Sequence, residues 1–405
     1  MSTSLLYHAW GVTTYDYCRT EYRSGALFLH IVKKRILQRC VCCGSANVTR
    51  EGGDCYEWRT LPVGSKPAFL VAHLDILRCG DCGEVRQESR DVADPRKTYT
   101  RALARYIRGL LGEMTILAVA EHIGLSWDTV KEILRSDLER RAKHRSWRRV
   151  KRIAIDEIAI RKGHDYMTVV VDIDTGHVLY TAKGNDQAAL KAFFRRLRRA
   201  GAKLKAVAVD MSQAYANAIN EYWPWPVAIV HDHYHIVANM NKVVDEVRRD
   251  EQNRLEGEGK QVLKGSRYLL LRGAEKTAQD PVKQARLEAL LSANELMHKV
   301  YLLKEDLRSF WAQRTKAAAR RFVKQWVADA LTLGNKHVTR FANTVLEHLD
   351  TIVAWYKHRI TSGPLEGLNN KIKVLKRKAY GYRDIEFFGL RLLFIHETKF
   401  NLSGA

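Results

Sequence analysis

The chain of 405 residues contains no apolar run approaching the roughly 20 residues that a helix needs to cross a bilayer. Its first residues also lack a basic segment followed by an apolar one, so no secretory signal is visible. Acidic residues are in the minority, with 45 Asp and Glu against 68 Lys and Arg, and the net charge is +23 at pH 7. These features argue against a membrane partner. They predict a cytoplasmic protein that binds a polyanion, and nucleic acid is favoured because the positive charge clusters.

The chain is too long to fold around a single hydrophobic core, so about two to four domains are expected. Hydrophobic residues make up 46% of the chain, which excludes wholesale disorder. A nucleophilic Ser or Cys motif is also missing, so chemistry that depends on a protein nucleophile is not indicated.

Two copies of Cys-x-x-Cys-Gly carry the most specific pattern of the N-terminal region. Four thiolates at this spacing can surround one Zn²⁺ ion, and the glycine after each pair allows the tight turn that the site needs. Short strands at 56–59, 69–71 and 74–78 would complete a zinc ribbon. Because all four positions are filled, the zinc would be structural. The expected ligands are Cys40, Cys43, Cys79 and Cys82.

Other readings of the seven cysteines stay open. The pairs would otherwise be unrelated buried thiols or a redox pair, and Cys42 competes with its neighbours as a ligand. Cys18 and Cys55 have no partner in this scheme and are expected to be packed as small apolar groups.

Residues 115–134 have the pattern of two helices joined by a tight turn. Ala120 is small enough for the helices to cross closely, Gly124 suits the turn, and Ser126 can cap the second helix. The pattern predicts a helix-turn-helix whose second helix enters a major groove; an ordinary helical hairpin is the alternative. The side chains expected to contact DNA are Trp127, Asp128, Thr129 and Lys131, followed by Arg148 and Arg149 of a basic linker.

From residue 149 the pattern changes to alternating strands and helices. Strands are predicted at 152–156, 166–172, 177–182, 205–209 and 227–230, with helices at 186–199 and 212–222. This βββαβαβ order matches the ribonuclease H-like fold. Residues 235–356 are almost entirely helical in pattern and too many for a loop, so they predict an all-helical insertion.

Three acidic residues stand out against the basic background. Asp156 and Asp210 each end a predicted strand, and Glu366 lies in a later helical segment. Two strand-end carboxylates and one helical carboxylate can hold two divalent metal ions about 3.5–4 Å apart, the arrangement that cleaves phosphodiesters. Most such acids are solvated surface charges, and Asp232 and Glu157 are rivals for the third position. The cations expected to neutralise phosphates beside the metals are Lys371, Lys373, Lys376 and Arg377.

Taken together, these stretches resemble insertion-sequence transposases of the DDE type, in particular the ISL-three family. The resemblance covers nearly the whole chain and includes both Cys-x-x-Cys-Gly copies, the helix-turn-helix and the segments around the three acids. It implies a catalytic triad of Asp156, Asp210 and Glu366, two Mg²⁺ ions with Mn²⁺ as a substitute, and a helical insertion before the glutamate. It also implies supporting roles for Asp232 and His235, although His235 is alternatively an ordinary core histidine.

The expected fold class is therefore multidomain α+β. An N-terminal extension and zinc ribbon would occupy 1–92 and a helix-turn-helix domain 93–148. A ribonuclease H-like catalytic domain would be split into 149–245 and 358–405 by an all-helical insertion at 246–357. In that insertion, Trp311, Trp326 and Trp355 are expected to pack in the helical core, with stacking on DNA as the alternative.

The expected function is Mg²⁺-dependent cleavage and strand transfer at terminal inverted repeats, with double-stranded DNA as end and target. At least a homodimer is expected to assemble on the DNA. A DNA-binding regulator with an inactive nuclease-like domain and a structure-specific nuclease are the alternatives. A zinc-dependent hydrolase is disfavoured because the four-cysteine site has no open position.

Overall fold

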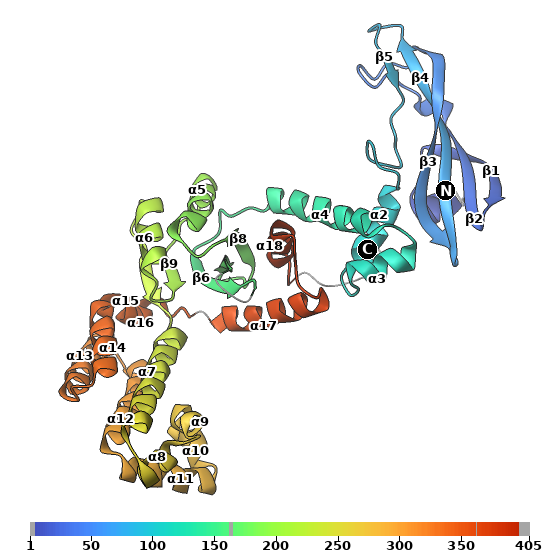
Figure 1. Ribbon diagram of the computed structural model, residues 1–405. Coiled ribbons are helices and arrows are strands. Elements are labelled where there is room, and N and C mark those ends of the chain that lie inside the picture. Colours follow the sequence, from blue (N-terminus) through green and yellow to red (C-terminus); the bar gives the residue numbers. More distant parts are fainter. Residues whose placement is uncertain (1–4, 162–164, 362, 397–405) are drawn as a thin grey trace. The chain divides into compact units, whose positions relative to one another are not determined.

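The computed structural model describes residues 5–161, 165–361 and 363–396, and Figure 1 shows the elements along the chain. These residues fall into two compact units, with the division between Lys143 and His144. Among the helices of the described ranges, none combines the length and the apolar character needed to span a lipid bilayer.

The first unit contains a five-stranded sheet in the order β1-β2-β4-β3, with β5 beside β4. β3 and β4 form a long antiparallel hairpin, whereas β2 and β4 run parallel. A short helix α1 (Leu5–Trp10) precedes the sheet. The strands are β1 (Tyr15–Arg23), β2 (Ala26–Lys33), β3 (Val48–Val63), β4 (Lys66–Cys79) and β5 (Val85–Gln87). The short strands predicted at 56–59, 69–71 and 74–78 are thus parts of two longer ones.

Three helices complete this unit: α2 (Arg101–Leu110), α3 (Ile116–Ile123) and α4 (Trp127–His144). Gly124 ends α3 in the left-handed conformation, with φ 69°. The Ser126 hydroxyl accepts a hydrogen bond from the Thr129 amide at 3.2 Å and caps α4. The predicted turn and cap are therefore confirmed.

The second unit is built on a sheet in the order β10-β9-β6-β7-β8. The first three strands along the chain pair antiparallel, and β9 and β10 then add parallel to β6. The strands are β6 (Arg152–Ala159), β7 (Tyr166–Asp172), β8 (Val178–Lys183), β9 (Ala206–Val209) and β10 (Ala228–His231). Their order and the helices between them match the predicted βββαβαβ pattern.

Helices cover both faces of this sheet. Alternate strand residues point to opposite sides, so Ile155 and Val207 pack with α5 (Lys191–Arg199) and α6 (Gln213–Tyr222). Ala154 and Ala208 pack instead with α17 (Gly363–Lys378) and α18 (Ile385–Leu393). This second packing brings a C-terminal helix against the strands that carry the candidate acids.

Between β10 and α17 the chain is almost entirely helical and has its own hydrophobic core. Its longest helix, α7 (His233–Arg254), runs without a break across the expected boundary between residues 245 and 246. The other helices are α8 (Gly257–Leu263), α9 (Arg267–Leu271), α10 (Ala274–Ala278), α11 (Pro281–Ala293), α12 (Glu295–Arg308), α13 (Lys316–Thr332), α14 (Lys336–Glu347), α15 (Leu349–Val353) and α16 (Trp355–His358).

The three tryptophans of this region pack mainly as core. Trp326 is 3% exposed, and its indole Nε1 donates to the Leu303 carbonyl at 2.9 Å. Trp311 is partly buried against the helical core, and Trp355 against the α17 side of the sheet. The expectation of core packing is confirmed most clearly for Trp326.

Candidate functional site

Two carboxylates lie where neighbouring parallel strands stop pairing. The parallel ladder between β6 and β9 ends at Ala154 opposite Ala208, and Asp156 and Asp210 each follow two residues later. Asp156 does not end its strand, contrary to the prediction. β6 continues to Ala159 because it still pairs with β7, up to Ala159 opposite Tyr166.

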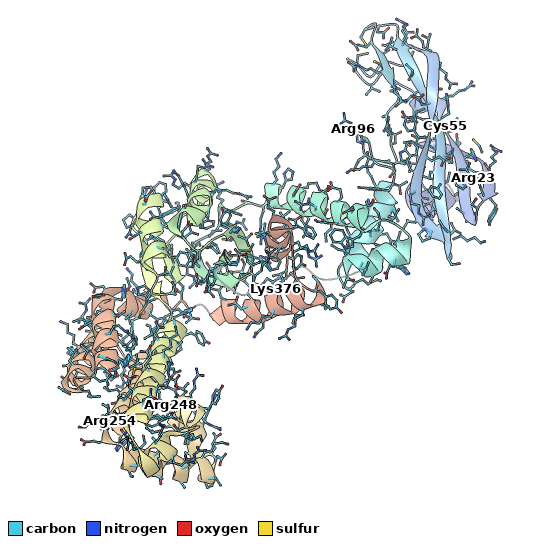
Figure 2. All side chains as sticks on the ribbon, in the orientation of Figure 1. Arg23, Cys55, Arg96, Arg248, Arg254 and Lys376 are labelled. Carbon is cyan, nitrogen blue, oxygen red and sulfur yellow. The ribbon has the colours of Figure 1, made fainter. Side chains whose placement is uncertain are left out.

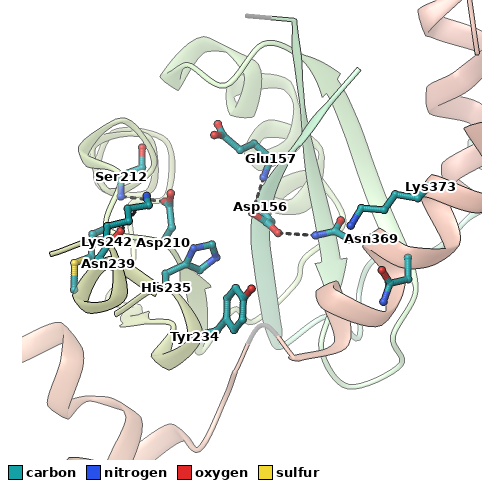
Figure 3. Close-up of a pocket in the computed structure, with 12 residues that line it drawn as sticks. Asp156, Glu157, Asp210, Ser212, Tyr234, His235, Asn239, Lys242, Asn369 and Lys373 are labelled. Carbon is teal, nitrogen blue, oxygen red and sulfur yellow. Dashed lines mark hydrogen bonds between the residues drawn. The ribbon is translucent and has the colours of Figure 1, made fainter. Parts of the chain in front are cut away.

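The two acids line a cavity of about 590 Å³. Figure 3 shows Asp156 and Asp210 between two groups of helical side chains. The strand ends also supply Glu157, Met211 and Ser212; α7 supplies Tyr234, His235, Asn239 and Lys242; α17 supplies Asn369, Asn370 and Lys373. The cavity therefore has carboxylates from the strand ends, and both α7 and α17 contribute side-chain amides and one lysine each.

Backbone and side-chain donors fix the two carboxylates. Asp156 Oδ1 accepts from the Glu157 amide at 2.8 Å, and its Oδ2 accepts from Asn369 Nδ2 at 3.3 Å. Asp210 Oδ1 accepts from the Ser212 amide at 3.0 Å. Glu157 is held separately, by Asn185 Nδ2 at 2.8 Å.

The electrostatics of Asp156 fit a cation-binding site. Burial is the main cause of its raised pKa, and the nearby Asp210 charge raises the pKa further. The Glu157 amide, His235 and Asn369 oppose this shift but do not cancel it. A divalent cation would offset the cost of two close, half-buried carboxylates, and Mg²⁺ prefers such oxygen ligands. The residues present therefore fit a divalent metal.

The predicted third acid, Glu366, lies on α17, but its side chain is outside the described part of the structure. Position 366 precedes Asn369 by three residues and Lys373 by seven, which is the spacing of one helix face. Its rival Asp232 is 2% exposed at the start of α7 and is not among the described residues that line the cavity. His235, by contrast, lines it.

The four cations of α17 that were predicted to lie beside the metals have different surroundings. Lys373 lines the cavity, whereas Lys376 donates to the Ala159 carbonyl at the end of β6, at 2.8 Å. Lys371 lies 2.9 Å from Nδ1 of His396, and Arg377 is exposed. Only Lys373 of these four is therefore placed beside the acid pair by the described contacts.

Sequence reasoning missed the contribution of α7. Asn239 and Lys242 follow His235 by four and seven residues, so helical spacing alone would have added them once His235 was chosen. Asn369 was not singled out either. Nothing in the sequence showed that its amide contacts Asp156.

A second candidate metal site lies in the first unit. The sulfur atoms of Cys40, Cys43, Cys79 and Cys82 all lie within 4.8 Å of one another. Backbone N–H groups of residues 43 and 42 lower the pKa of the Cys40 thiol to about 7, and the thiolate is the form that binds zinc. The pKa values of the Cys43 and Cys82 thiols are raised instead, so these two would lose their protons only as the metal binds. The glycine after each pair is left-handed, with φ 75° at Gly44 and 70° at Gly83. The four residues therefore fit Zn²⁺, and Cys42 is outside the group.

The expected packing of Cys18 and Cys55 is wrong, because both are exposed. Cys18 lies at an irregularity of β1, where the register with β2 shifts between Tyr17 and Arg19. Cys55 alternates with Tyr56, which packs against the core, and therefore points to the other face of the sheet.

The side chains predicted to contact DNA from the helix-turn-helix differ in how exposed they are. Trp127 is 43% exposed, and the Lys131 ammonium lies 5.1 Å from the centre of its ring. Asp128 is exposed, whereas the Thr129 hydroxyl lies 2.8 Å from the capping hydroxyl of Ser126. In the second unit, Arg148 and Arg149 are exposed.

Comparison with protein families gives two matches. A model described as a transposase, of the DDE type and the ISL3 group, matches residues 153–392. A second model, described as the helix-turn-helix domain of transposase family ISL3, matches residues 88–137.

Curated relatives are similar over most of the chain. The transposase for insertion sequence element IS1001 of Bordetella parapertussis is 33% identical over 390 residues, which cover 95% of each chain. The transposase for insertion sequence element IS1557 of Mycobacterium tuberculosis is 28% identical, over 89% of this chain and 86% of that protein. Among solved structures, the Drosophila P element transposase strand transfer complex covers 75% of this chain and 94% of its own, at 11% identity. Its TM-score of 0.38 is too low to support an argument.

Proposed function

The chain belongs to the ISL3 family of DDE transposases, and from this premise we propose that it cuts DNA at the ends of an insertion sequence and joins them to a target. The observation that supports this most directly is the pair Asp156 and Asp210 in one cavity, with a lysine on either wall. A DNA strand would lie across that cavity with its scissile phosphate at the acids.

Asp156, Asp210 and Glu366 would hold two Mg²⁺ ions, or Mn²⁺ in their place. When bound, these ions supply an activated water and stabilise the leaving 3′ oxygen; the freed 3′-OH later takes the place of water on target DNA. Asn369 orients the Asp156 carboxylate through its hydrogen bond. Lys242 and Lys373 would attract the phosphate oxygens, and His235 would face the same strand from the first turn of α7. Asp232 would support the start of α7 from its buried position.

The first unit would recognise the terminal inverted repeats. Trp127, Asp128, Thr129 and Lys131 begin the second helix of the helix-turn-helix, the part that enters a major groove in such domains. The cysteine group would hold a structural Zn²⁺ that stabilises the end of the hairpin. Arg148, Arg149, Lys371, Lys376 and Arg377 would contact phosphates along the duplex.

The domain plan that goes with this function is also a proposal. The sheet of the second unit, with α5, α6, α17 and α18, would be a ribonuclease H-like catalytic domain, interrupted before Glu366 by a helical insertion. Pairing of two transposon ends would require at least a dimer on the DNA.

Asp156→Asn tests the function. The full chain and the variant are compared on duplexes that carry the inverted repeat found beside the coding region, with and without Mg²⁺. We expect equal binding and loss of strand cleavage in the variant; Asp329→Asn, at an exposed position on α13, is the matched control. A variant that cuts at the normal rate would contradict the assignment.

The same assay separates the alternative functions. A wild-type chain that binds the repeat but never nicks it in Mg²⁺ would favour a regulator. Cleavage of branched DNA regardless of the repeat would favour a structure-specific nuclease.

A further inference from the structure

The polar face of α7 continues beyond the cavity. His235, Asn239 and Lys242 line the cavity from the first turns of this helix. Continuing along the same helix face, in steps of four and three residues, the next side chains are Glu246, Arg249 and Asn253. All three are at least partly exposed. With about 1.5 Å of rise per residue, the helix carries this face well away from the acids. We call the surface formed by Lys242, Glu246, Arg249 and Asn253 the α7 face.

Cations outnumber acids on one side of the α7 face. Asp245 is shared by three guanidinium groups, from Arg248 at 2.8 Å, Arg267 at 3.4 Å and Arg249 at 3.6 Å. Arg248 is nearly buried and serves as the main partner, whereas the side chains of Arg249 and Arg267 are 60% and 54% exposed. One carboxylate cannot neutralise three arginines, so positive charge remains at the surface. Figure 2 labels Arg248 and Arg254 on this helix.

The other side of the face is built from one-to-one ion pairs whose cations are largely exposed. Glu246 accepts from Arg340 of α14 at 2.9 Å, and Arg340 is 67% exposed. Lys336, at the start of the same helix, lies 3.0 Å from Asp250 and is 74% exposed. Exposed ion pairs of this kind contribute only about 0–1 kcal/mol each, so their cations are free to exchange a carboxylate for a phosphate.

We propose that the α7 face is a binding track for the backbone of duplex DNA on one side of the scissile phosphate. This inference rests on the proposed function of the cavity. Lys242 contacts a phosphate at the cavity rim, and Arg249 contacts one further along the same strand. Their positions are about 10 Å apart along the helix axis, which matches roughly three base-pair steps of 3.4 Å axial rise when α7 runs along the duplex axis. Lys373 on the opposite wall would then contact the strand on the other side of the acids.

The composition of the surface favours nucleic acid over a protein partner. Within the described residues, the stretch from 242 to 253 has no exposed large apolar side chain. Protein interfaces depend on buried aromatic and aliphatic anchors, which are missing here. The stretch also holds four acids, but each is ion-paired with at least one cation. The exposed lysines and arginines around them, with the amides between, are side chains of the kind that contact DNA phosphates.

The experiment measures binding of the full chain, without Mg²⁺, to three fluorescent duplexes. One carries the inverted repeat and stops at its outer end, the second adds about ten base pairs of flanking DNA, and the third adds the same length inside the element. The double variant Arg249→Gln with Arg267→Gln (the α7 variant), which leaves Arg248 paired with Asp245, is compared with wild type and with Arg198→Gln combined with Arg199→Gln. The two control arginines are exposed on α5, outside the cavity.

We expect one extension, on the flanking or the inner side, to tighten wild-type binding, and the α7 variant to lose that gain. The slope of log K against log salt should become shallower by about 0.9 for each lost contact, about 1.8 in total. Binding to the short duplex should be unchanged, which shows that the variant is folded. The α5 control should keep both the gain and the slope.

Two results would overturn the inference while leaving the proposed function intact. Either neither extension tightens wild-type binding, or the α7 variant keeps the full gain. A wild-type chain that binds none of the three duplexes would overturn the proposed function, and the inference with it.

Discussion

Asn369 donates a hydrogen bond to Asp156 across 213 positions of sequence, from Nδ2 to Oδ2 at 3.3 Å. The contact joins α17 to β6 at the acid pair, and Lys376 makes a second link from the same helix to the end of the same strand. Glu366, the proposed third acid, lies one helical turn before Asn369 on the same helix. A single amide therefore links α17 to the carboxylate of Asp156.

Asn369→Ala should slow DNA cleavage without weakening DNA binding. A hydrogen bond to a charged group contributes about 1.5–3 kcal/mol, so the single-turnover cleavage rate should fall by roughly 10- to 100-fold. Asn217→Ala, at an exposed position on α6, is the control and should cut normally. If Asn369→Ala cuts like wild type, the amide does not orient Asp156 during the reaction.

Local patterns in the sequence were sufficient for most of the second unit's strands. The run 166–172 was predicted with the bounds it has in β7, since turn residues flank a continuous apolar stretch. The cap at Ser126 and the left-handed Gly124 were likewise set by local backbone requirements. Such features depend on neighbours in sequence, and sequence therefore predicts them.

Features set by tertiary pairing were harder to predict. Asp156 was placed at a strand end, but β7 extends β6 beyond it. Cys55 was expected to be buried, yet the alternation of a long hairpin turns it outward. Asn239 and Lys242 line the cavity because of the direction that α7 takes after β10, and no local sequence pattern specifies that direction.

Cys79→Ser should weaken the zinc binding proposed for the first unit. Four thiolates bind Zn²⁺ as a closed site, and loss of one ligand weakens the site and loosens the hairpin end. Metal analysis of the purified full chain should find one zinc ion in wild type and less than one in the variant. Cys42→Ser should keep the full zinc content, because Cys42 is outside the group of four. Loss of zinc from Cys42→Ser would show that the ligand set is wrong.

Stability should fall in mild acid because of His231. Burial, with a smaller contribution from His348, lowers the pKa of His231 to about 4, and its Nδ1 has no hydrogen-bond partner in the described structure. The unfolded chain would bind this proton near pH 6.5 and the folded chain only near 4. Stability is therefore complete above about pH 6.5 and declines as the pH falls toward 4, by roughly 2–3 kcal/mol.

The measurement for His231 is the unfolding free energy of the second unit's transition at pH 7.5 and 4.5. His231→Gln should lower stability at pH 7.5 but show a smaller difference between the two pH values. An unchanged pH dependence would assign the acid sensitivity to other groups.

Arg59→Ala should disconnect the sheet of the first unit from its helix-turn-helix. Arg59 is 8% exposed, and its Nη2 donates to the Ile123 carbonyl at the end of α3 at 2.9 Å. Removing the guanidinium leaves that carbonyl without its charged donor, which should cost about 1.5–3 kcal/mol of unfolding free energy in this unit. Affinity for the inverted repeat should fall too, because both modules then lose their fixed spacing. Arg23→Ala, at a half-exposed pair with Glu57, is the control and should change stability by less than about 1 kcal/mol. Equal stability and affinity for Arg59→Ala and wild type would show that the two modules are positioned by other contacts.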